Sequence, residues 1–286
     1  MLRSNEVRLN HGHKLNLKKG LLELVLILIV LAFLYPFYTV ISVALKTTRE
    51  AIIAPLSFPK SLYLQNFVTV WKLMNFQTVF INSTILSSLS LAGLVIVAGM
   101  CSFSIVRMNN RLYNALYYLF ISAIMVPFYM TLSPLIKLMK DLGFLNSLIG
   151  VALAYIGRGL PFAIFLYVGF IRGIPTEIME SAVIDGCPPL KLYWQIVFPI
   201  MKPVTATLVI LDALWIWNDF LFPLLTLTSE AKRTIPLSQY HFYGMYSTQY
   251  ELAFSAYLIA MLPLIILYIF LQKHIIKGIV AGAVKG

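Results

Sequence analysis

Long apolar segments separated by short polar stretches form the main hydrophobic pattern of this chain. A helix needs about 20 mostly apolar residues to cross roughly 30 Å of hydrocarbon, and inside lipid its backbone groups must bond to one another. Six segments meet this length, so the pattern predicts an all-α polytopic membrane protein with six transmembrane helices. The predicted spans are Leu21–Leu45, Val79–Val106, Leu112–Ile136, Leu148–Ile171, Pro203–Leu227 and Leu252–Leu271.

The spans and the polar ends divide the chain into three parts. Residues 1–20 form a basic N-terminal tail, residues 21–272 a six-helix membrane domain, and residues 273–286 a C-terminal tail. The first span exceeds the apolar core of about 7–15 residues found in a signal peptide, so we expect it to be retained. Prolines inside the spans predict kinks. They are Pro127, Pro161, Pro223 and Pro263.

Composition agrees with a membrane location. Hydrophobic residues make up 60% of the chain and charged residues 12%, against about 25% charged in soluble proteins. The net charge is +11, but the basic residues are scattered, which is typical of cytoplasmic loops and lipid headgroups rather than of a nucleic-acid surface. Cys101 and Cys187 lie in different settings, and no metal-binding spacing occurs, so we expect neither a disulfide framework nor a metal site.

The basic residues also predict an orientation. With the N-terminus inside, 13 of the 22 Lys and Arg residues lie on the cytoplasmic side and 8 on the outer side, while Arg158 lies within a span. Lysine and arginine are enriched in cytoplasmic loops. We therefore expect a multi-pass protein of a bacterial plasma membrane with both termini in the cytoplasm.

The loop at residues 172–203, between the fourth and fifth spans, is too patterned for an ordinary connector. Pro175 and Thr176 are typical of a helix start, and Gly186 followed by prolines is a stop signal. Between them one helical stripe is apolar, with acidic and hydroxyl residues mostly opposite. The stripe consists of Ile178, Met179, Ala182 and Val183.

A second short helix is predicted after the turn. Its apolar positions follow the i, i+3, i+4, i+7 spacing. They are Leu190, Tyr193, Trp194 and Val197. Two amphipathic helices joined by a sharp turn are compatible either with a pair lying on the lipid headgroups or with a docking element for a soluble partner.

The loop resembles the cytoplasmic signature of importer permeases, in which Glu-Ala-Ala, three residues, Gly and nine residues precede Ile-x-Leu-Pro. Glu180, Ala182 and Gly186 occupy this pattern, and Ser181 and Phe198 depart from it without removing the helix-turn-helix. The chain is similar over nearly its whole length to the smaller six-span permease of maltose-type ATP-binding-cassette (ABC) importers. Other matching runs are Tyr35-Pro36, Asn82-Ser83, Ile184-Asp185-Gly186, Trp217-Asn218-Asp219-Phe220 and residues 281–286.

This resemblance implies a type I ABC importer permease fold and half of a pore for a sugar or oligosaccharide. The 175–199 loop would dock on a separate ATPase that binds ATP and Mg²⁺, and this chain would bind no cofactor. Further implied partners are a homologous second permease, two ATPase subunits in all, an extracellular solute-binding protein and membrane lipid. The C-terminal tail is implied to reach toward the ATPases. The implied docking residues are Glu180, Ser181, Ala182, Asp185, Gly186, Ile196 and Pro199.

Polar residues inside spans usually face a bundle interior or an aqueous path. Asn218 and Asp219, together with Trp215 and Trp217 just before them, are candidates for the substrate pathway because aromatic rings beside amide and carboxylate groups suit sugars. Alternatively these tryptophans are interfacial. Arg158 is expected to form a structural pair with Asp212.

Two other classes are disfavoured, and the cargo stays open. The sequence has no phosphate loop of the Gly-x-x-x-x-Gly-Lys type and no Gly-x-Ser-x-Gly elbow, so we do not expect an enzyme. A secondary transporter would be expected to carry inverted repeats, which the sequence lacks. Glycerol phosphate and other polyols remain alternatives to sugar. By position in the resembled family, the tyrosine-rich outer loop at residues 229–250 would contact the binding protein.

Overall fold

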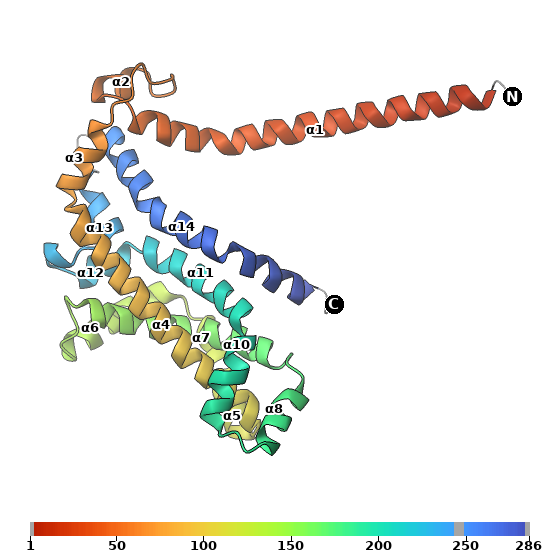
Figure 1. The fold of residues 1–286 in the computed structure, drawn as a ribbon. Helices are drawn as coiled ribbons and strands as arrows, with labels where there is room; N and C mark the ends of the chain where they lie inside the picture. The colour runs from red at the N-terminus through yellow and green to blue at the C-terminus, as the bar shows by residue number, and fades with distance from the viewer. Residues whose placement is uncertain (1–2, 243–248, 284–286) are drawn as a thin grey trace. The chain divides into compact units, whose positions relative to one another are not determined.

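The computed structural model describes residues 3–242 and 249–283, with side chains for 19–240, 242, 249–270 and 272. Every regular element in these ranges is a helix (Figure 1). The fold class predicted from the apolar segments is therefore confirmed.

Among the described residues, four helices are long and apolar enough to cross a membrane unbroken. They are α1 (Arg3–Ala44, through its part Lys19–Ala44), α4 (Phe76–Met108), α7 (Leu148–Ile171) and α14 (Tyr250–Ala283, through Tyr250–Phe270). The α7 bounds equal those predicted. Helix α1 also includes most of the stretch expected as a polar tail.

The third and fifth predicted spans are broken helices. Helices α5 (Arg111–Ile124) and α6 (Phe128–Asp141) meet at 106°. Pro127 stands immediately before α6 in an extended conformation, which a proline's fixed φ favours. The stretch predicted as one span from Pro203 to Leu227 instead forms α11 (Lys202–Asn218) and α12 (Leu221–Thr226), because the extended backbone of Asp219 ends α11.

The chain forms two compact units, residues 1–70 with 242–259, and residues 71–241 with 260–286. The first unit contains α1, the short α2 (Thr48–Ile53), most of α3 (Gln65–Leu73) and the start of α14. Lys46 is the notable side chain of this unit. It is 0% exposed, and its ammonium donates hydrogen bonds to the carbonyls of Ala54, Pro55 and Ser57 at 2.9, 2.9 and 2.6 Å.

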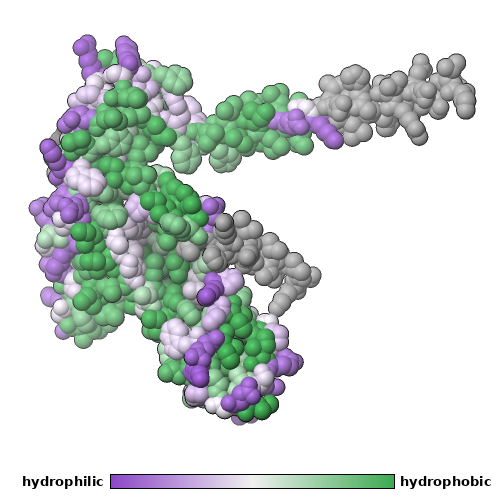
Figure 2. All heavy atoms as spheres, in the orientation of Figure 1, coloured by the Kyte–Doolittle hydropathy of each residue, from purple (hydrophilic) through white to green (hydrophobic). Residues whose placement is uncertain are grey.

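The second unit is built on the packing of α4 against α7, its most extensive helix pair. Its main apolar cluster includes Leu94 and Ala98 of α4 and Ile164 and Tyr167 of α7, and it continues to Tyr193 in the 172–203 loop. That loop therefore shares a core with the membrane helices. Figure 2 shows polar residues gathered around the α5 and α8 end of this unit, with apolar residues over its helices.

Short helices also belong to the second unit: η2 (Glu230–Lys232), α13 (Ile235–Gln239) and, up to residue 241, η3 (Tyr240–Phe242). The buried Asn82 amide of α4 donates to the carbonyls of Ala231 and Arg233 at 2.8 and 3.0 Å. The Ser83 hydroxyl accepts the Ile235 N–H at 2.9 Å. The Asn82-Ser83 pair thus fixes this segment to α4.

Candidate functional site: the 172–203 loop and a membrane-depth cavity

The first half of the loop is helix α8 (Thr176–Ile184), which ends in a defined turn. Gly186 has φ +76°, a conformation that residues with a Cβ rarely adopt. The Cys187 N–H donates to Ala182 O at 2.9 Å and the Gly186 N–H to Val183 O at 3.0 Å. These two bonds form a Schellman motif, in which the glycine closes the helix and satisfies its last carbonyls. The predicted sharp turn is therefore present.

The structure divides the predicted apolar stripe of α8. Met179 and Ala182 pack into the core of the unit, whereas Ile178 and Val183 are exposed. Ile184, at the end of the helix, is 85% exposed. The hydrophilic implied docking residues Glu180, Ser181 and Asp185 are exposed, as is Gly186. An outward face with both apolar and acidic groups is thus presented on a helix anchored by its inner face.

The second half of the loop departs from the predicted regular helix. It consists of α9 (Pro189–Leu192), a π-helix η1 (Tyr193–Val197) and α10 (Phe198–Ile200). Pro199 has no N–H to continue the α-helical ladder. The N–H of Phe198, the residue before it, bonds to Tyr193 O, five residues back, as in a π-helix. The wider turn changes which residues share a face. Three side chains, Leu192, Tyr193 and Val197, are buried, while Leu190, Trp194 and Pro199 are exposed and Ile196 is half-buried.

Tyr193 connects this loop to α4, a contact that the sequence pattern did not predict. Its ring packs on Phe103 with centroids 5.5 Å apart. A Cβ built on Gly99 would lie 2.1 Å from the Tyr193 hydroxyl oxygen, so only glycine fits at position 99 without displacement. The hydroxyl is buried and has no hydrogen-bond partner in the described part of the chain. Glycine within an otherwise apolar helix was the available signal.

A charged cluster is formed by residues of the predicted fourth and fifth spans, where charge is costly. The guanidinium of Arg158 on α7 is placed 3.8 Å from the ring centre of Phe128 and 3.5 Å from that of Trp215. Asp219 Oδ2 is 4.0 Å from Arg158 and accepts a 2.9 Å hydrogen bond from the Tyr155 hydroxyl. The expected Arg158–Asp212 pair is therefore wrong: the end of α11 brings Asp219, rather than Asp212, within ion-pair distance.

The other two predicted pathway residues have local partners. Trp217 is buried, and its Nε1–H donates to the Ala260 carbonyl at 3.1 Å. The Asn218 side chain is exposed, and its amide donates to Leu214 O at 2.7 Å. Trp217 thus packs within the bundle, whereas Asn218 remains at the surface.

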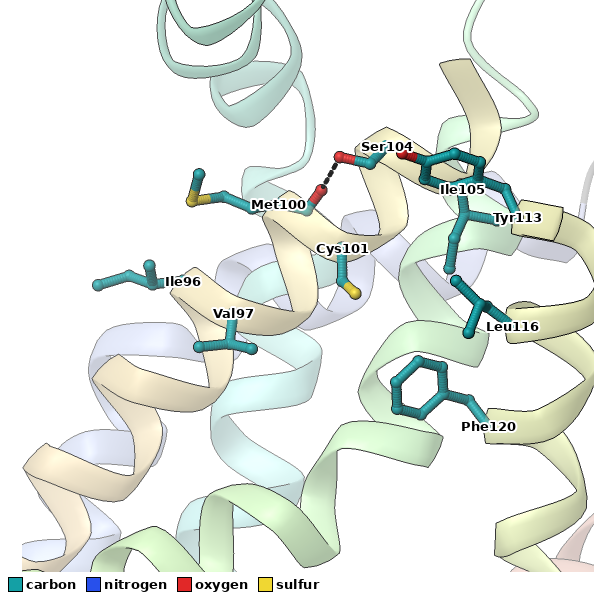
Figure 3. A pocket seen from close by; sticks show the side chains of 9 residues that line it. All are labelled: Ile96, Val97, Met100, Cys101, Ser104, Ile105, Tyr113, Leu116 and Phe120. Carbon is teal, nitrogen blue, oxygen red and sulfur yellow. Dashed lines mark hydrogen bonds between the residues drawn. The ribbon is translucent and has the colours of Figure 1, made fainter. Parts of the chain in front are cut away.

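The described residues of the second unit line at least two cavities. One, of about 370 Å³, is lined by Tyr129, Trp215, Asn218, Asp219, Phe220 and Leu221. The other, of about 390 Å³, is a groove between α4 and α5 in which Cys101, Leu116 and Phe120 point toward one another (Figure 3). Its polar hydroxyl at Ser104 donates to the Met100 carbonyl. Only the first cavity combines aromatic rings with an amide and a carboxylate.

Some of the predicted features lie in residues that the structure does not describe. Tyr243 and Tyr246 of the tyrosine-rich loop, and the side chains of the tail from residue 273 onward, lie outside the described residues. Within the described residues, no three His, Cys, Asp or Glu side chains are grouped to hold a metal ion.

Comparison of the sequence with known proteins identifies the family of this chain. Residues 95–280 match the model of the family "Binding-protein-dependent transport system inner membrane component". The protein described as "Probable starch degradation products transport system permease protein AmyC" from Thermoanaerobacterium thermosulfurigenes is 35% identical over 95% of this chain and 99% of its own length. The melibiose/raffinose/stachyose import permease protein MelC of Bacillus subtilis is 32% identical over 93% and 96%.

A solved structure shares the fold. A chain of a bacterial ABC transporter involved in the import of the acidic polysaccharide alginate superposes with a TM-score of 0.78 at 19% identity, over 90% of this chain and 96% of that one. With the family model matching residues 95–280 and near full-length relatives above 30% identity, this chain belongs to the family of binding-protein-dependent transport system inner membrane components.

Proposed function

We propose that this chain is a permease subunit of an ABC importer, that it forms half of the pore for a sugar or oligosaccharide, and that the 175–199 loop couples the pore to a separate ATPase. Relatives named for starch degradation products and for melibiose, raffinose and stachyose support a saccharide cargo. ATP and Mg²⁺ would be bound by the ATPase. A homologous second permease, two ATPase subunits and an extracellular binding protein would complete the assembly, with both termini in the cytoplasm.

The observation that carries this proposal is the two-sided character of the loop. The outer face of α8 presents Glu180 and Ile184 to a partner, while its inner face packs through Ala182 into the apolar core of the second unit. The Schellman bonds and the Tyr193 contact fix the geometry between these faces. A force applied at the exposed face is therefore passed to α4 and α7 rather than absorbed by a flexible loop.

The test is co-purification of the permease pair with its ATPase, using charge reversals at two exposed carboxylates. Glu180→Lys is expected to lower ATPase association at least tenfold, because it replaces an attraction to basic partner residues with repulsion. Asp141→Lys, at the exposed end of α6 on the opposite side of the predicted membrane, is the matched control and should retain association. Failure of the folded wild-type pair to bind the ATPase would refute the proposal.

A variant that loses an exposed apolar side chain separates the contribution of charge to docking from that of apolar contact area. Ile184→Ser removes the most exposed apolar side chain of α8 and touches no core residue. It is expected to weaken docking several-fold at both low and high salt, whereas the Glu180→Lys defect should diminish as salt screens the charges. Equal salt dependence of the two variants would show that the face does not dock as described.

A further inference from the structure

Two helix breaks meet at the 370 Å³ cavity. Tyr129 lies in the first turn of α6, just after the α5–α6 break, and the interval between α11 and α12 provides Asp219 and Phe220. Irregular backbone at membrane depth is stable only where it is covered by protein or lines an aqueous cavity. Because residues beside one break and within the other line this cavity, it is the space in which water would reach the free backbone groups at Asp219 and Phe220.

The lining of this cavity matches the chemistry of a sugar ring. Tyr129, Trp215 and Phe220 offer aromatic surfaces against which pyranose C–H groups can pack. Asn218 and Asp219 offer amide and carboxylate groups that bond hydroxyls. The volume is at the lower end of the range of roughly 300–1,000 Å³ for small-molecule sites, which suits a single ring.

Arg158 determines the charge and shape of this lining. Its guanidinium is stacked between Phe128 and Trp215, which fixes the indole that lines the cavity. Its positive charge opposes the negative charge of Asp219. The pair leaves no unpaired positive charge to attract an anion, and nearby Asp212 adds none. The cavity is therefore suited to an uncharged ligand.

We propose that this cavity is a subsite for one neutral pyranose unit of the cargo. Tyr129 stacks on the ring, Asn218 and Asp219 bond its hydroxyls, and Arg158 is a positioning residue that holds Trp215 and Asp219. The inference rests on the proposed saccharide-importer function, and it assigns direct substrate contact to this chain and not only to its partner permease.

The first test uses two equally exposed tyrosines. Tyr129 is 67% exposed and lines the cavity, while Tyr118 on α5 is 68% exposed and does not. In proteoliposomes with the complete importer and its binding protein, Tyr129→Ala is expected to lower ATP-driven uptake of maltotriose or raffinose about fivefold, the scale of one lost aromatic contact. Binding-protein-stimulated ATP hydrolysis should persist, so less saccharide is imported per ATP. Tyr118→Ala should match wild type.

A second test addresses Arg158. Arg158→Lys keeps the positive charge beside Asp219 but loses the planar stacking surface. It is expected to lower saccharide uptake per ATP as Tyr129→Ala does, while the thermal stability of the assembly stays within the range of the Tyr118→Ala control. An Arg158→Lys importer that loses stability but keeps its uptake per ATP would show a purely structural role.

Direct labelling decides where the ring binds. A maltotriose carrying a photoreactive diazirine, irradiated with the importer trapped by a non-hydrolysable ATP analogue, should label peptides containing Tyr129 or residues 218–221. Labelling confined to the partner permease, or uptake by Tyr129→Ala equal to that of Tyr118→Ala, would overturn the subsite while leaving the importer function intact. Uptake restricted to acidic saccharides would also overturn it. A wild-type chain that assembles with no ATPase would instead refute the proposed function.

Discussion

Gly99 and Tyr193 provide a quantitative test of how the 172–203 loop is joined to the membrane helices. Gly99→Ala adds one Cβ that would lie 2.1 Å from the Tyr193 hydroxyl oxygen and 3.3 Å from Cζ. Normal contact requires more than 3 Å, so the hydroxyl must move by about 1 Å. Tyr193 is buried and packed against Phe103, Trp194 and Phe198, so its ring cannot retreat without shifting the loop.

The size of the effect follows from overpacking. A methyl group forced into a filled core costs about 1–3 kcal/mol. Tyr193→Phe removes the clashing oxygen and leaves Cζ as the nearest atom, at a tight but tolerable distance. Because the hydroxyl is buried without a partner in the described chain, its removal alone is expected to be neutral or stabilising by up to about 1 kcal/mol. The double variant should recover most of the Gly99→Ala loss.

The measurement is a double-mutant cycle on the free energy of unfolding of the permease pair, titrated with SDS in mixed micelles. A coupling energy of about 1–2 kcal/mol is expected. The same four proteins, assembled with ATPase, should show reduced ATP-dependent transport for Gly99→Ala and recovery in the double variant. Strictly additive stabilities would refute the reasoning, since the added methyl would then be accommodated elsewhere than at the Tyr193 hydroxyl.

Three further substitutions test other parts of the structure. Lys46→Met leaves three carbonyls without their charged donor and should lower stability by about 3 kcal/mol, whereas Lys60→Met, at an exposed lysine, should be neutral in the same SDS titration. Gly186→Ala meets no atom within 4 Å but must adopt φ +76°, so a loss of about 1–2 kcal/mol is expected from backbone strain alone, with a smaller loss for Gly186→Asn. Asn82→Ala removes the two hydrogen bonds from the buried Asn82 amide to Ala231 and Arg233, and limited proteolysis should detect faster cleavage near residue 231. Unchanged cleavage would imply that the segment is held by other contacts.

Features encoded by local spacing were predictable from the sequence. The bounds of α7 follow from an uninterrupted apolar run, and the end of α8 follows from Gly186 and the prolines after it. The exposure of the acidic residues of α8 could also be anticipated. The division of its apolar stripe could not, because Met179 and Ala182 are covered by the unit's own core while Ile178 and Val183 remain exposed.

Features that depend on where a helix breaks were not predictable. Asp212 and Asp219 are about two turns apart on one face of a straight helix, so spacing could not decide which would meet Arg158. The extended backbone at Asp219 decides it, and no glycine or proline at that position marks the break. The burial of Lys46 likewise depends on carbonyls supplied by a later loop.

Helix α1 carries an evolutionary consequence. No residue in the most hydrophobic window of its spanning part is buried within the chain, and the family model begins only at residue 95. Nothing in the chain's own core therefore selects particular side chains along that window. Substitution there is constrained by hydropathy and by the lipid or protein that surrounds the helix, and not by packing within this chain.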